Sequence, residues 1–191
     1  MKLIKKEVKT YEELEEHRTN DLKIYEGGNE LSVLCDETEI VVVGSFMPPR
    51  LVYFYNENPY MYKGIDDSRG TNIFKYRKNY PKDLSSDKKD AIVSEISKVL
   101  KEQKIAFVDI TKFVLTKEGS ISDKHIKAFL ADSKILEMLR YKKRVISITE
   151  DVNDYLLNKG IKNEYIKLFP GRSKKYPKGT DYYKLWKEAF D

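Results

Sequence analysis

Short runs of consecutive apolar residues predict four β-strands along this chain. The first run, residues 40–43, is rich in β-branched side chains and leads into Gly44 and Ser45, followed by Phe46, Met47 and Pro48. A strand of this composition fits a position buried on both faces, and a glycine at its end lets the backbone turn sharply. Residues 105–108, 145–148 and 165–169 repeat the pattern, so we expect four strands of similar kind.

Between the strands, apolar residues recur at helical spacing. Thr10 followed by Glu13 forms a capping box that begins a first helix over residues 11–18. Further helices are predicted over 85–101, from Ser122 or Asp123 to residue 139, from Thr149 to a stop at Gly160, and over 181–190. Helices that alternate with strands indicate a parallel sheet, because parallel neighbours need crossover connections. We therefore predict a single domain over residues 1–191, a three-layer α/β/α fold around a central parallel sheet of about four strands.

In open sheets of this kind, ligands bind beyond the carboxyl ends of the strands. The polar residues that follow the predicted strands are Gly44 and Ser45, then Asp109 and Thr111, then Thr149 and Glu150, then residues 170–173. One edge of the sheet is therefore expected to collect most of the candidate chemistry.

The segment from residue 48 to 85 is too long for an ordinary turn, and its many Tyr and Phe residues argue against disorder. Within it, Asp66, Asp67, Asn72 and Phe74 lie close together in sequence. Two interpretations stay open from the residues alone. The segment is either a functional loop or a covering loop whose rings seal the sheet while Asp and Asn make local turn hydrogen bonds.

Composition and charge limit the kinds of partner and site that we expect for this chain. The 191 residues carry a net charge of +5, and two stretches, 75–82 and 171–179, hold several Lys and Arg with Tyr and no acidic residue. Such stretches are typical of phosphate contacts combined with ring stacking, or of plain solvated loops. Cys35 is the single cysteine, which excludes an internal disulfide and argues against a thiolate metal site. No apolar run approaches the ~20 residues of a membrane span, and no signal segment is visible, so we expect a cytoplasmic protein.

The order of several motifs resembles the uracil-DNA glycosylase superfamily, in particular its hypoxanthine-type and small bacterial branches. These motifs are the Gly44, Ser45, Phe46 turn with Pro48, the aromatic pair Phe54 and Tyr55, and the element Asn72, Ile73, Phe74. The end of the chain is similar too, with a strand, a Pro170, Gly171, Arg172, Ser173 loop and a helix that carries Trp186. The chain departs from the family pattern at Met47, an extra residue, at Lys75 in place of Trp, and at Arg172. His17 and His125 lie on predicted helices, and neither matches the family's loop histidine.

The resemblance implies a DNA glycosylase that extrudes and hydrolyses a damaged, deaminated base without metal or cofactor, acting in DNA repair as a monomer on duplex or single-stranded DNA. The implied catalytic residues are Asn72, which positions water or recognises the base, and a general base among Asp66, Asp67 and Asp109. The implied base-binding residues are Gly44, Ser45, Phe46, Phe74 and Tyr55, with Asn58 as a rival to Asn72. The implied DNA-binding residues are Lys75, Arg77, Lys78, Arg172, Ser173, Lys174 and Lys175.

Two other functions stay open. The chain can have the same fold but act as a catalytically silent nucleic-acid-binding module. It can also be a small α/β enzyme that acts on a free nucleoside or nucleotide, for which the basic stretches would matter little.

Overall fold

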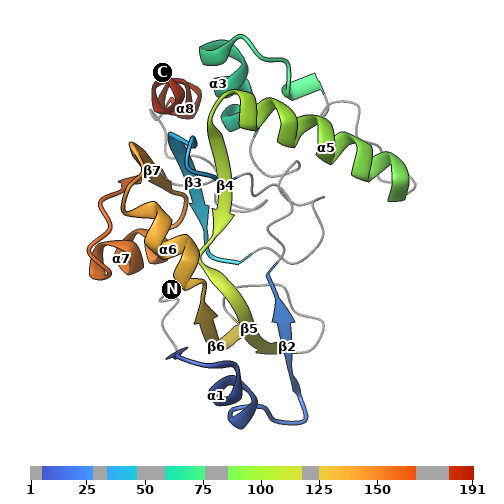
Figure 1. Cartoon of the computed structure of the whole chain (residues 1–191), viewed down its shortest axis with the longest axis vertical. Helices are drawn as coiled ribbons and strands as arrows, with labels where there is room; N and C mark the ends of the chain where they lie inside the picture. The colour runs from blue at the N-terminus through green and yellow to red at the C-terminus, as the bar shows by residue number, and fades with distance from the viewer. Residues whose placement is uncertain (1–5, 28–33, 47–58, 76–85, 118–124, 167–180) are drawn as a thin grey trace.

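A computed structural model describes residues 6–27, 34–46, 59–75, 86–117, 125–166 and 181–191. Four parallel strands form its central sheet in the order β4-β3-β7-β8. They are β3 (Ile40–Gly44), β4 (Ile105–Asp109), β7 (Arg144–Ser147) and β8 (Glu164–Tyr165). All residues of β3 and β4 are buried, as expected for strands covered on both faces. The predicted α/β fold with a parallel sheet of about four strands is thus confirmed (Figure 1).

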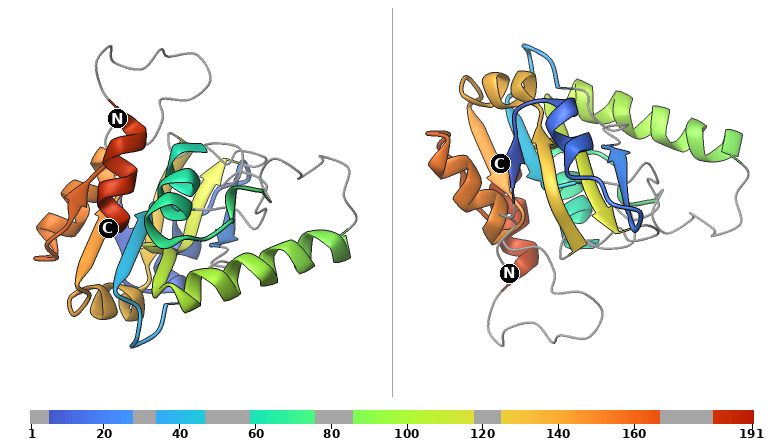
Figure 2. Two further views of the ribbon diagram at one scale, coloured as in Figure 1. Left: turned by 90° about the horizontal axis from the view of Figure 1, so that it is seen from above. Right: turned by 90° about the horizontal axis from the view of Figure 1, so that it is seen from below.

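Three helices cover one face of this sheet (Figure 2): α3 (Pro59–Arg69), α5 (Ser86–Glu102) and α8 (Tyr182–Phe190). Alternate residues of β3, Ile40 and Val42, point into this layer and pack with side chains of all three helices. Trp186 of α8 is fully buried there and stacks on Phe190 with ring centroids 5.8 Å apart. A fully buried aromatic side chain contributes roughly 1.5–3 kcal/mol, so these two rings stabilise the packing of α8.

The helices α6 (Ser133–Leu139) and α7 (Glu150–Asn158) lie on the other face, where Val41 and Val43 point. The Thr149 hydroxyl accepts a hydrogen bond from the Val152 N–H at 3.2 Å and so caps α7 as predicted. Gly160 follows the helix with φ +71°, a conformation that glycine adopts without strain.

A second sheet, with strand order β1-β6-β5-β2, was not predicted. Its strands are β1 (Glu7–Val8), β6 (Ile126–Ala131), β5 (Thr111–Lys117) and β2 (Leu22–Glu26). Only Ile110 separates β4 from β5, so one nearly continuous strand passes from the first sheet into the second. Helix α1 (Tyr11–Glu16) covers the outer face of the second sheet with Leu14. Figure 1 shows this sheet below the parallel one.

The predicted helix from Ser122 or Asp123 to residue 139 is wrong in its first half, because residues 126–131 form β6. The reason lies in a register shift between β5 and β6, where Leu115 pairs with Ala128 but Thr116 pairs with Ile126. The extra residue puts Ile126 and Phe129 in the same core cluster. Apolar side chains three apart on one face imitate a helix, which explains the error.

The long loop predicted over residues 48–85 is also wrong in part, because α3 lies within it. Gly64 hid this helix from the sequence analysis, because glycine is unfavourable inside helices. A Cβ at Gly64 would lie 2.9 Å from the backbone carbon of Trp186, so a glycine is needed where α8 crosses. The first helix is confirmed, but it ends at Glu16, and His17 is its C-cap. His125 lies in 3-10 conformation, outside any α-helix, and directly precedes β6.

Candidate functional site

Gly44 and Asp109 meet at the carboxyl ends of β3 and β4. The two residues are register partners, and a Cβ on Gly44 would lie 2.4 Å from Asp109 Oδ1. The Asp109 side chain therefore occupies the space that any other residue at position 44 would need. Asp109 is only 4% exposed, so an acidic side chain is buried at the edge where the sequence predicts the site.

The residues after Gly44 are tied to the strand that crosses between the sheets. The Thr111 hydroxyl donates to the Ser45 carbonyl at 2.6 Å, and the Ile110 N–H donates to the Gly44 carbonyl at 3.1 Å. Ser45 and Thr111 are both buried. Phe46 is half-buried and packs against the core on the side of α6 and α7. This turn is therefore rigidly placed next to Asp109.

Asn72 and Phe74 are held by a different carboxylate, that of Asp66. Asp66 Oδ1 accepts hydrogen bonds from the Thr71 hydroxyl at 2.6 Å and the Ile73 N–H at 2.7 Å, while Oδ2 accepts from the Phe74 N–H at 2.9 Å. Ile73 is fully buried, Phe74 is half-buried against the core beneath α3, and Asn72 is exposed. Lys75, next in the chain, is exposed as well.

Asp67 faces away from this turn and joins α3 to α8. The Lys63 ammonium lies 2.5 Å from Asp67 Oδ2, and the Tyr183 hydroxyl donates to the same oxygen. The hydrogen bonds from Lys63 and then from Tyr183 hold the pKa of the Asp67 carboxyl below its usual range. A carboxylate engaged in this way is a weak proton acceptor, which makes Asp67 a poorer general base than its sequence position suggests.

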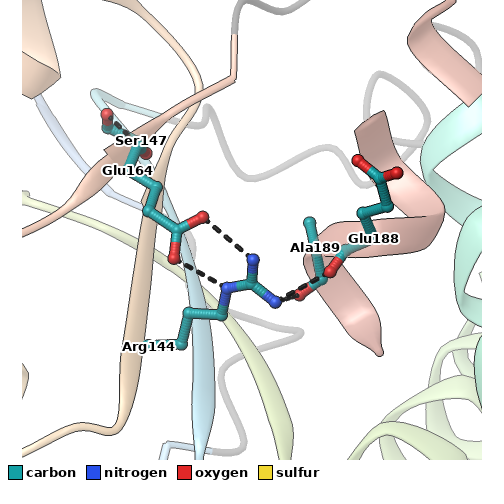
Figure 3. A network of polar contacts seen from close by, with 5 residues as sticks. All are labelled: Arg144, Ser147, Glu164, Glu188 and Ala189. Atoms are coloured by element: carbon teal, nitrogen blue, oxygen red, sulfur yellow. Dashed lines mark hydrogen bonds and ion pairs between the residues drawn. The ribbon is translucent and has the colours of Figure 1, made fainter. Parts of the chain in front are cut away.

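At the opposite edge, where the strands of the parallel sheet begin, Arg144 of β7 binds β8 and the end of α8 (Figure 3). Its guanidinium binds both oxygens of Glu164, at 2.7 and 3.0 Å, and donates to the backbone carbonyls of Glu188 and Ala189 at 2.9 and 2.8 Å. A cation at the carboxyl end of a helix also satisfies its unpaired carbonyls. Arg144 thereby fixes the end of α8 against the first residues of β7.

The structure thus brings Gly44, Ser45 and Asp109 together, and gathers Asn72 and Phe74 around Asp66. Asp67 belongs to neither group. Sequence reasoning named Asp66 only as a candidate general base, and it gave no role to Lys63 or Tyr183. The contact of Tyr183 could not be predicted because its partner, Asp67, lies on another helix. The predicted residues outside the described part of the chain are Tyr55, Asn58, Arg77, Lys78, Arg172, Ser173, Lys174 and Lys175.

The described residues contain no group of three or more His, Cys, Asp or Glu side chains placed to hold a metal ion. They also contain no helix with the length and apolarity of a membrane span. A surface pocket of about 440 Å³ is lined by Glu15, Arg18, Thr19, Asn20, Leu22 and Lys23. It lies on α1 and β2 in the second sheet's layer, apart from the groups described above.

The chain is similar in structure to a protein from Methanosarcina acetivorans whose solution NMR structure bears the description "putative Uracil DNA glycosylase". The identity is 20%, the TM-score is 0.53, and the likeness covers 88% of this chain and 97% of the other. At this level of identity the comparison shows a shared fold. No family model and no curated protein matches the chain.

Proposed function

We propose that this protein is a DNA glycosylase that hydrolyses the bond between a deaminated base and deoxyribose. The observation that carries the proposal is the buried Asp109 carboxyl beside the Gly44 turn, at the carboxyl edge of a parallel sheet. The fold shared with a protein described as a "putative Uracil DNA glycosylase" supports it. Fold alone does not define activity, so the chemistry must come from the residues at this edge.

The reaction develops two opposite charges, and the site has a group for each. The sugar becomes cationic as the bond to the base lengthens, and a carboxylate in a poorly solvated site stabilises a nearby cation more strongly than one in water. Asp109, which is 4% exposed, fits this role. It would also accept the proton of the water that adds to the sugar carbon. Backbone amides near Gly44 and Ser45 would hold the departing anionic base.

Asn72 and Phe74 would recognise and stack the extruded base. Extrusion costs a few kcal/mol, and one stacked ring returns about 1–3 kcal/mol, so stacking alone roughly balances the cost. Phosphate contacts would supply the remainder. The residues proposed for them are Lys75, Arg77, Lys78, Arg172, Ser173, Lys174 and Lys175.

The decisive experiment incubates the protein with duplexes that contain uracil, hypoxanthine or xanthine, followed by alkali to break abasic sites. We expect cleavage of at least one duplex, and a loss of about 10²–10⁴-fold in single-turnover rate for Asp109→Asn. Asp154→Asn, at an exposed position on α7, is the matched control and should cleave as the wild type does.

Three results would contradict the proposal. Binding of DNA without release of any base would favour a silent binding module. Cleavage of free nucleosides but not of DNA would favour a small-molecule enzyme. An Asp109→Asn variant with wild-type rates would remove Asp109 from the mechanism.

A further inference from the structure

We propose that Asp66 is a positioning residue that fixes Asn72 and Phe74 for the reaction, and that it is not the general base. The inference rests on the proposed function for its catalytic consequence. Its structural part, the attachment of the 71–74 turn to α3, can be tested independently. Asp66 lies three residues before the end of α3, within the same helix as its neighbour Asp67.

The three hydrogen bonds to Asp66 come from both sides of Asn72. The Thr71 hydroxyl precedes it, and the Ile73 and Phe74 N–H groups follow it, at 2.6, 2.7 and 2.9 Å from the carboxylate oxygens. The backbone on either side of Asn72 is therefore attached to one carboxylate. The Asn72 side chain stays exposed, so it is placed without being used for packing.

Two further features make this attachment rigid. Gly70 ends α3 with φ +65°, which lets the chain reverse so that the next residues return to Asp66. Ile73 is fully buried in the core beneath α3, so the turn cannot shift without moving a core side chain. The turn is fixed at its start by Gly70, in its middle by the buried Ile73 and along its length by the Asp66 carboxylate. It therefore has little conformational freedom.

The same bonds argue against a role in proton transfer. An ionised carboxylate offers about four acceptor positions, and three of those on Asp66 are occupied by donors from the protein. A general base must instead direct a lone pair at the attacking water. Asp66 is therefore suited to hold the turn.

The test compares Asp66→Ala, Asp66→Asn and Thr71→Val with the wild type. Hydrogen exchange at the Ile73 and Phe74 amides reads out the turn directly. We expect exchange to accelerate roughly tenfold or more in Asp66→Ala, since hydrogen bonds to a charged acceptor are lost. Asp67→Asn, at the next position on the helix, should leave these two amides protected.

Excision kinetics then test the consequence. A displacement of about 1 Å can cost about 10²-fold in rate, so we expect a loss of that order in Asp66→Ala. Asp66→Asn retains one carbonyl oxygen and should lose less, roughly tenfold, with the pH dependence of the rate unchanged in shape. Affinity for undamaged DNA should not change in any of these variants.

The outcomes separate the two proposals. If Asp66→Asn abolishes the acidic limb of the pH profile, Asp66 is a general base and the inference is wrong. Unchanged amide exchange in Asp66→Ala would equally overturn it. If the wild type releases no base from any duplex, the proposed function fails. The inference is then decided by amide exchange and by whether Asp66→Ala weakens Phe74-dependent quenching of 2-aminopurine in single-stranded DNA.

Discussion

The contact between Gly44 and Asp109 can be tested by a double-mutant cycle. A methyl group at position 44 would lie 2.4 Å from Asp109 Oδ1 and 3.6 Å from Ile148 Cδ1. The second distance is ordinary, but the first requires a movement of about 1 Å by a buried side chain. Overpacking of this kind typically costs about 1–3 kcal/mol. We expect Gly44→Ala to destabilise the protein by that amount.

In an Asp109→Ala background the obstructing atom is absent, so the same Gly44→Ala change should cost less than about 0.5 kcal/mol. Any gain from replacing a flexible glycine, roughly 0.5–1 kcal/mol, is common to both backgrounds and cancels in the cycle. The coupling should therefore be about 1–3 kcal/mol, which is large compared with the scatter of independent sites.

The assay is urea unfolding of the four proteins at neutral pH, with the slope against urea checked for constancy. Gly70→Ala is the control: no atom lies within 4 Å of the new methyl, and only the positive φ of +65° opposes it. Its cost should not depend on Asp109. Additive effects at Gly44 and Asp109, within about 0.5 kcal/mol, would refute the reasoning and with it the tight placement of the Asp109 carboxyl.

Three further predictions follow from other contacts. Gly64→Ala should lower the free energy of unfolding by about 1–3 kcal/mol, because the new methyl group would clash with the backbone of α8, which cannot move away. The roughly 1 kcal/mol gained by an alanine in a helix is subtracted from this loss, and urea unfolding measures the difference. Because the pKa of Asp67 is lowered in the folded protein, its contribution is present at neutral pH and is lost as the pH falls through that lowered value. The melting temperature of Asp67→Asn should accordingly trail the wild type at pH 7 and approach it in acid; a gap independent of pH would contradict the ion pair. Neutralising Arg172, Lys174 and Lys175 should weaken DNA binding and flatten its salt dependence by about 0.9 per lost phosphate contact, measured by anisotropy; an unchanged slope would reject these residues as phosphate ligands.

The parallel sheet was predictable because its strands are buried on both faces. Runs such as residues 40–43 leave no periodicity to misread, and glycine and polar residues mark their ends. The second sheet was hidden for the opposite reason. β5 follows β4 with one residue between them and no turn signal. In β6, a bulge puts Ile126 and Phe129 on the same face although they are three residues apart, a spacing typical of a helix.

The candidate site divides in the same way. Gly44 and Asp109 were predicted at one edge, because the ends of adjacent parallel strands must meet there. The separate roles of Asp66 and Asp67 were not predictable. The two are neighbours in sequence, yet one binds a turn a few residues away and the other binds Tyr183 on α8, 116 positions along the chain. Only packing of α3 against α8 separates them.

The passage of one strand through both sheets has a mechanical consequence. Ile110, at the junction, donates to Gly44 in the first sheet, and its carbonyl accepts from the Asp132 N–H at the end of β6 at 2.8 Å. Asp109, just before this junction, is consequently next to a residue bonded to both sheets. A displacement of the second sheet would reach Asp109 directly, without passing through a loop. Residues near the amino terminus, which complete that outer layer, thereby help to determine the shape of the site.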